Sequence, residues 1–175
     1  SRGLGDVYKR QPLEKELRWE KQWIPEHLSA VGNEPWDTVW DRLTDGFRPE
    51  TVPAGTVFYQ QGDPAREVIF LQTGQIRVEC IHSSGKKRVL CLLFEGIPVG
   101  EDECLFGGPR EYRAVAVTAC QIFRIPAEVF KRRAEASPAL ALKLFQISAR
   151  KSQVLGRMLI RDSFLSVRGL SLIHI

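Results

Sequence analysis

The sequence is poor in the residues that build metal centres. It contains three histidines, His27, His82 and His174, which lie far apart and form no His-x-His pair. Nor does it contain a recognisable constellation of nucleophile, acid and base. We therefore expect no metal ligands, no catalytic residues and no enzymatic activity.

The sequence also lacks closely paired cysteines and long apolar runs. Cys80, Cys91, Cys104 and Cys120 are dispersed through apolar segments, without the spacing of a zinc or iron–sulfur site. No apolar run is long enough to cross a membrane, and no signal peptide is visible. We expect buried, reduced thiols and a cytoplasmic protein with no membrane partner.

The two ends of the sequence resemble sequencing adapter rather than protein. The segment LSLIHI (170–175) can be encoded by the strand complementary to the one that encodes DVYKRQ (6–11). We therefore interpret residues 1–11 and 170–175 as adapter artefacts, which are set aside before fold prediction. Their removal lowers the formal net charge from +4 to +2, so the pI of about 9.0 does not indicate nucleic-acid binding.

Residues 12–47 are predicted to form a helical lead-in. Apolar residues between 13 and 24 indicate a first short helix that ends at Pro25. Between Pro35 and Gly46, apolar residues recur at spacings of three and four and predict a second helix: Trp36, Val39, Trp40 and Leu43. The four tryptophans of the lead-in need burial, and packing as a cap on a larger β body provides it.

Residues 48–136 have the character of a β domain that ends in a short helix. Short β-rich segments separated by glycine-containing turns predict strands over residues 56–60, 67–72, 75–82, 87–94, 113–117 and 121–125. Many short strands at near-regular spacing are typical of a closed or double-sheet jelly roll. A short helix is expected over 127–136, so the fold class is mainly β with flanking helices.

A long helix is predicted over 137–165, because Ser137 and Pro138 form a good start and no breaker follows before Gly156. Its apolar residues occupy more than one side of the helix, so we expect the helix to pack against a second partner in addition to its own domain. A second copy of the chain is the simplest partner. We expect a homodimer helix that uses Leu144, Ile147, Ser152, Leu155, Met158 and Leu159.

One motif in the β region carries the chemistry. Residues 100–116 read Gly-Glu-Asp-Glu-Cys-Leu-Phe-Gly-Gly-Pro-Arg-Glu-Tyr-Arg-Ala-Val-Ala. This resembles the phosphate-binding cassette of the cyclic-nucleotide-binding family, in which a Gly-Glu pair, a short helix and a Pro-Arg pair precede a strand. The segments VFYQQGD (57–63) and IFLQTGQI (69–76) precede it in the family's order, and the resemblance covers nearly all of residues 48–167.

The resemblance implies a cyclic-nucleotide-binding-type β-roll, also called a double-stranded β-helix, with a small-molecule effector and no fixed cofactor. It implies that Glu101 binds a ribose and that Arg110 binds a cyclic phosphate. The expected ligand-binding set is Gly100, Glu101, Pro109, Arg110, Glu111 and Tyr112. The alternative is that Glu101 and Arg110 pair with each other as a structural ion pair in an empty roll.

Two departures from the family pattern bear on the ligand. Glu111 and Tyr112 stand where nucleotide binders have small or hydroxylic residues, and a carboxylate repels a phosphate. Leu155 and Gly156 fall where the catabolite-activator branch has the hydroxyl pair that reads adenine. A cyclic nucleotide remains the candidate ligand of the cassette, but cAMP is disfavoured.

The long helix resembles the dimer helix of Crp/Fnr-type transcription regulators, with residues 166–169 as the start of a hinge. The resemblance implies a truncated regulator whose DNA contacts belong to a missing helix-turn-helix domain. An effector would then control DNA binding allosterically through the dimer. The alternatives are a regulatory domain of a kinase or channel and, disfavoured by the histidine spacing, a cupin-type metalloenzyme.

Overall fold

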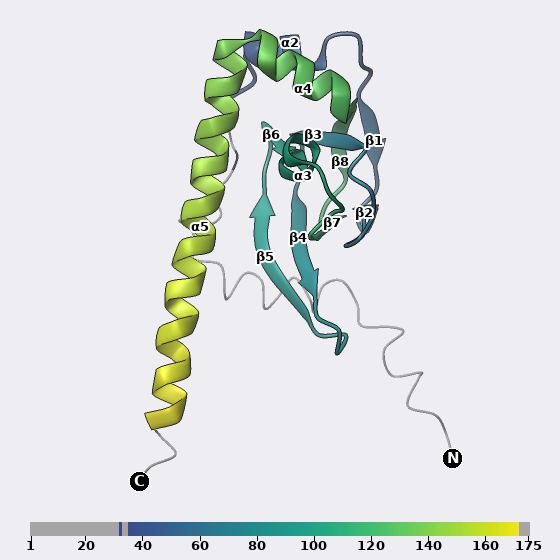
Figure 1. The fold of residues 1–175 in the computed structure, drawn as a ribbon. Coiled ribbons are helices and arrows are strands. Elements are labelled where there is room, and N and C mark those ends of the chain that lie inside the picture. The colour runs from purple at the N-terminus through teal and green to yellow at the C-terminus, as the bar shows by residue number, and fades with distance from the viewer. Residues whose placement is uncertain (1–31, 33–34, 172–175) are drawn as a thin grey trace, which may run out of the picture.

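The computed structural model describes residue 32 and residues 35–171, with side chains described as far as residue 160 except for Met158. The first helix of the lead-in, expected over residues 13–24, lies outside the described residues. The described residues form a β-roll with a cap of short helices at one end and one long helix along its side (Figure 1).

The roll consists of two four-stranded antiparallel sheets, with strand orders β1-β8-β3-β6 and β2-β7-β4-β5. All six predicted strands are present, and the predicted jelly-roll class is confirmed. Two further strands of three residues each were not predicted, because they are too short to show alternation. The strands are β1 (Glu50–Val52), β2 (Val57–Tyr59), β3 (Glu67–Thr73), β4 (Ile76–Ile81), β5 (Lys87–Leu93), β6 (Ile97–Val99), β7 (Arg113–Ala116) and β8 (Cys120–Pro126).

Strand β3 is the centre of the core. It pairs with β6 on one side and β8 on the other, and its residues from Val68 to Leu71 are fully buried. One face of β3 packs into the roll, while helices contact the strand from outside. Burial on both faces explains why this segment is continuously apolar instead of alternating.

The cap begins with helix α2 (Thr38–Thr44). Asp37 is its N-cap, and the carboxylate accepts a hydrogen bond from Val39 N at 2.9 Å. Pro35 therefore lies before the helix. The sequence had instead indicated a position just inside its first turn. The buried ring of Trp40 packs on Phe70 with centroids 4.7 Å apart, which confirms the capping role of this tryptophan.

Helix α4 (Ala127–Ala136) is present with its predicted bounds, and α5 (Pro138–Ser171) follows it. Buried residues on α5 recur at helical spacing and face the roll and the cap: Leu140, Leu144, Ile147 and Val154. The helix passes through Gly156 and also through residues 166–169, where a hinge was expected. Helix α5 thus lies beside β5 and extends beyond the roll (Figure 1).

Candidate functional site

The cassette is built around a tight turn at Gly100, between β6 and helix α3 (Glu101–Phe106). Gly100 has φ of +74°, in the left-handed region. A Cβ at this position would collide with Nη1 of Arg110 and come within 3.1 Å of the ring of Tyr59. Only glycine therefore allows the arginine to approach the start of α3.

We expect Gly100→Ala to lower the free energy of unfolding by about 2–3 kcal/mol, because the cost of backbone strain at positive φ adds to the cost of displacing Arg110. Gly85→Ala is the matched control, since Gly85 has φ of +79° and nothing within 4 Å of its Cβ position. That variant should lose only about 1 kcal/mol from the backbone. Urea denaturation of both variants measures the difference, and equal losses would contradict the close packing of Arg110.

Arg110 is buried under the cassette, with 2% of its surface exposed. Its Nη1 donates to Gly100 O at 2.5 Å, and its Nη2 donates to Glu67 O on β3. The guanidinium also lies over the ring of Tyr59, 4.2 Å from the centroid. Arg110 thus joins the cassette to strands of both sheets.

Glu101 is also buried, and its partner is Lys151 of α5. Lys151 Nζ donates to Glu101 Oε1 at 2.5 Å and to Pro98 O at 3.0 Å, while Glu101 Oε2 has no hydrogen-bond partner. Burial raises the pKa of Glu101, and the charge of Lys151 opposes the rise. The expected alternative, an ion pair between Glu101 and Arg110, is therefore wrong.

Arg110 has a different acidic partner, which the sequence reading missed. Glu103 Oε2 lies 3.3 Å from Arg110 Nη1, and Glu103 Oε1 accepts a hydrogen bond from Glu111 N at 3.2 Å. The one signal in the sequence is that Glu103 lies inside the cassette, between Gly100 and Arg110. The pairing of Glu103 with Arg110 was not predicted.

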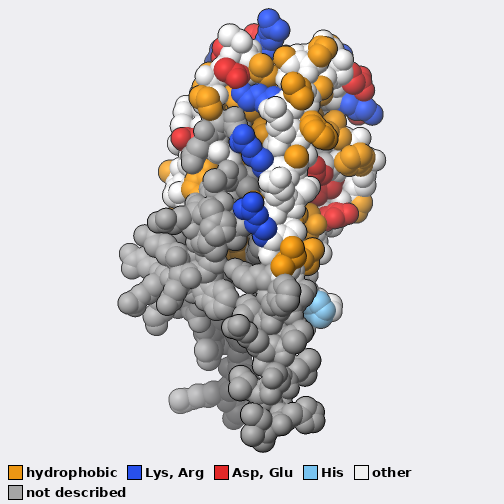
Figure 2. Space-filling model, turned by 90° about the vertical axis from the view of Figure 1, so that its left-hand side faces the viewer, with side chains coloured by type: hydrophobic (Ala, Val, Ile, Leu, Met, Phe, Trp, Pro, Cys, Tyr) orange, Lys and Arg blue, Asp and Glu red, His pale blue; other side chains and the backbone are white. Residues whose placement is uncertain are grey.

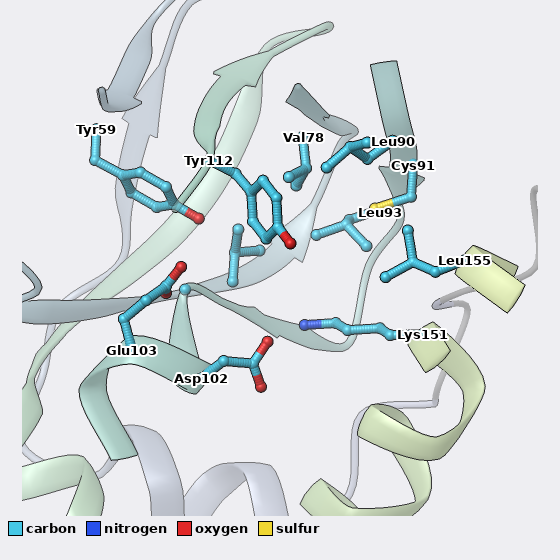
Figure 3. Close-up of a pocket in the computed structure, with 12 residues that line it drawn as sticks. Tyr59, Val78, Leu90, Cys91, Leu93, Asp102, Glu103, Tyr112, Lys151 and Leu155 are labelled. Carbon is cyan, nitrogen blue, oxygen red and sulfur yellow. The ribbon is translucent and has the colours of Figure 1, made fainter. Parts of the chain in front are cut away.

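A pocket lies between the cassette, the sheet of β4 and β5, and helix α5 (Figure 3). Its wall is mostly apolar, and Lys151 and Leu155 reach into it from α5. The residues that line the pocket are Tyr59, Val78, Leu90, Cys91, Leu93, Val99, Gly100, Asp102, Glu103, Tyr112, Lys151 and Leu155. Burial raises the pKa of the Cys91 thiol to about 11, so this side chain is uncharged at neutral pH. The cavity measures about 70 Å³, against roughly 300–1,000 Å³ for typical ligand pockets.

The expected ligand-binding residues divide into three groups. Gly100 and Tyr112 line the pocket. Glu101 and Arg110 do not line it, and their side chains bond Lys151 and the backbone of Glu67 instead. Pro109 and Glu111 are exposed, and Pro109 pairs with Pro64 in an isolated β-bridge.

The expected dimer residues also divide. Leu144 and Ile147 are buried in the core of their own chain, so their assignment to a dimer interface is corrected, whereas Leu155 is half-buried and lines the pocket. Ser152 and Leu159 are exposed. The side chain of Met158 lies outside the described residues. The correction arises because one apolar stripe of α5 is used by the roll itself.

The described part of the chain shows no grouped metal ligands and no membrane-spanning helix. Among those residues, no three histidine, cysteine, aspartate or glutamate side chains are grouped so that they could hold a metal ion. No helix formed by them is both long and apolar enough to span a bilayer.

Known proteins resemble this chain in sequence and structure. The global nitrogen regulator of Synechococcus elongatus is 31% identical over 114 residues, which cover 62% of this chain and 51% of that protein. The cAMP-activated global transcriptional regulator CRP of Salmonella typhimurium is 26% identical over 118 residues, covering 67% and 56%. Among solved structures, the Thermus thermophilus catabolite activator protein gives a TM-score of 0.53 at 25% identity and covers 81% and 62%.

The chain spans about half the length of these curated relatives. The family model described as "Cyclic nucleotide-binding domain" matches residues 49–137, which include both sheets, the cassette and α4. This chain belongs to the cyclic nucleotide-binding domain family and is distantly related to the Crp/Fnr-type transcription regulators.

Proposed function

We propose that this chain is the effector-sensing part of a Crp/Fnr-type transcription regulator, in which a small molecule in the pocket changes the position of α5. The observation that carries the proposal is the contact between Glu101 and Lys151. It links the cassette to α5 at the wall of the pocket, and Leu155 of the same helix also lines that wall. A ligand that displaces these side chains therefore acts on the helix directly.

The relatives support a role in transcription. Two of them are named as global regulators, and a third is a catabolite activator protein. Because this chain spans about half the length of the curated relatives, we assign DNA binding to a region outside these 175 residues. The coding sequence that follows residue 169 in the source genome tests this assignment. A helix-turn-helix domain is expected, whereas a kinase or pore domain would overturn it.

We further propose that α5 forms a homodimer through the face that points away from the roll. Residues on that face recur with alternating spacings of three and four, as in a coiled coil: Leu142, Phe145, Ala149, Ser152, Gly156 and Leu159. Leu142 is 59% exposed and Phe145 is 70% exposed, which is unusual for side chains of this size. Figure 2 shows hydrophobic and basic side chains together along this side of the molecule.

Phe145→Glu is expected to weaken dimerisation at least about 100-fold, because it removes an apolar anchor and places two carboxylates in the interface. Light scattering after gel filtration, over a range of protein concentrations, measures the change. Gln146→Glu is the matched control, since it adds the same charge about 100° further around the helix. A dimer that resists Phe145→Glu, or one that Gln146→Glu breaks equally, would contradict the proposed interface.

A further inference from the structure

The place in the cassette where an anion would bind already contains an anion. The carboxylate of Glu103 bridges the guanidinium of Arg110, at 3.3 Å, and the backbone N–H of Glu111, at 3.2 Å. A guanidinium and a backbone N–H are the donors with which proteins commonly hold a phosphate. Only 10% of the Glu103 side chain is exposed, so the carboxylate belongs to the packed interior of the site.

Arg110 has little hydrogen-bonding capacity left for a ligand. Nη1 is shared between Gly100 O and Glu103, and Nη2 is used by Glu67 O. The ring of Tyr59 covers one face of the guanidinium. Nε is buried without a partner and is not accessible to solvent, and one N–H of Nη2 is left after the bond to Glu67 O. Both N–H groups of Nη1 are therefore taken, and a phosphate can bond this side of Arg110 only if Glu103 first moves away.

The charged groups around the site also disfavour an anionic ligand. Asp102 and Glu103 lie in the first turn of α3, and Glu111 follows Arg110 directly. The other cation at the pocket, Lys151, is paired with Glu101 and so adds no uncompensated positive charge. An anionic ligand would meet net repulsion here, whereas an uncharged ligand would not.

We propose that Glu103 is a built-in substitute for the ligand phosphate, which closes the anion seat and restricts the pocket to small, uncharged, mainly apolar effectors. The inference rests on the proposed function, because it assigns the ligand class of the same pocket. The apolar wall of Val78, Leu90 and Leu93, with the Tyr112 ring beside it, provides the complementary surface (Figure 3).

The test is to remove the internal anion and to offer an external one. Inorganic phosphate at 50 mM, compared with sodium chloride at equal ionic strength, should raise the Tm of Glu103→Ala by at least about 3 °C and leave the wild type unchanged. Glu135→Ala is the matched control, since it removes the same charge from an exposed position of α4 that does not line the pocket. It should respond as the wild type does.

Several outcomes would overturn the inference. These are a phosphate shift in the wild type equal to that of Glu103→Ala, no shift in a folded Glu103→Ala, or an equal shift in Glu135→Ala. Glu103→Gln, which keeps the shape of the side chain, replaces Glu103→Ala if that variant does not fold, and it should show a smaller shift of the same sign. Binding of cAMP to the wild type with a Kd below about 10 µM by calorimetry would also overturn it.

The oligomeric state of the same samples tests the proposed function separately. A dimeric wild type without a phosphate shift in Glu103→Ala refutes the inference and leaves the sensor proposal standing. A monomeric wild type with the shift refutes the proposed dimer and leaves the assignment of Glu103 standing.

Discussion

Lys151→Met is expected to lower the free energy of unfolding by about 3 kcal/mol at neutral pH, because it leaves the carboxylate of Glu101 buried without a counter-charge. Glu101 is 1% exposed, and its Oε1 is 2.5 Å from Lys151 Nζ in the native protein. Urea denaturation measures the loss. Arg157→Met is the matched control, since it removes one positive charge from an exposed position of the same helix and should cost less than about 0.5 kcal/mol.

The loss in Lys151→Met should depend on pH in a defined direction. Burial raises the pKa of Glu101 above its ordinary value of 4.5, and Lys151 opposes that rise. Between the unfolded and the folded pKa, the folded protein holds a proton that the unfolded chain has released, so stability falls as the pH rises. Removal of Lys151 raises the folded pKa further and extends this window upward.

The deficit of Lys151→Met relative to the wild type should therefore be smallest near pH 4 and should grow toward neutral pH. The double variant Lys151→Met/Glu101→Gln should recover most of the lost stability, because no charge then remains buried. A deficit that is constant with pH, or that Glu101→Gln does not reduce, would show that the lysine acts through packing alone.

Arg110→Met is expected to destabilise the protein by about 3 kcal/mol or more, which makes Arg110 a structural residue of this cassette. The substitution removes the hydrogen bonds to Gly100 O and Glu67 O and leaves the carboxylate of Glu103 without its cation. Arg110→Lys should recover only part of the loss, because an ammonium lacks the planar fork that reaches acceptors on two sides.

Arg132→Met on the exposed side of α4 is the control for the loss of an arginine, and its cost should stay below about 0.5 kcal/mol. Thermal and urea denaturation are the measurements. If Arg110→Met were as stable as the wild type, the packing of the cassette on β3 would need another explanation. Ligand assays on Arg110 variants alone would confuse unfolding with lost binding, and for this reason the anion test uses Glu103.

The cassette shows how far local sequence can be interpreted. The resemblance of the cassette implied a short helix after Gly100, and the structure has α3 at that place, where the acidic residues of its first turn favour a helix start. It did not identify Lys151 as the partner of Glu101, although both residues are charged. Fifty positions separate them in the chain, and no periodicity connects them.

Helix α5 shows the same division. Its helical periodicity and its two apolar stripes can be recognised in the sequence, but the stripe containing Leu144 and Ile147 was assigned to a second copy of the chain. The structure places that stripe against the roll and leaves Leu142 and Phe145 exposed. Periodicity shows that a face is apolar without showing what covers it.

The sequence by itself determined the order and type of most elements and the jelly-roll class, because these depend on alternation, helical spacing and turn residues within short segments, and its resemblance to a family motif located the cassette. Only the tertiary structure decided that Glu101 meets Lys151, that Arg110 meets Glu103, and which stripe of α5 faces the roll. Hydrogen bonds and ion pairs act over a few ångströms, and such distances between residues far apart in the chain are set by packing of the whole domain.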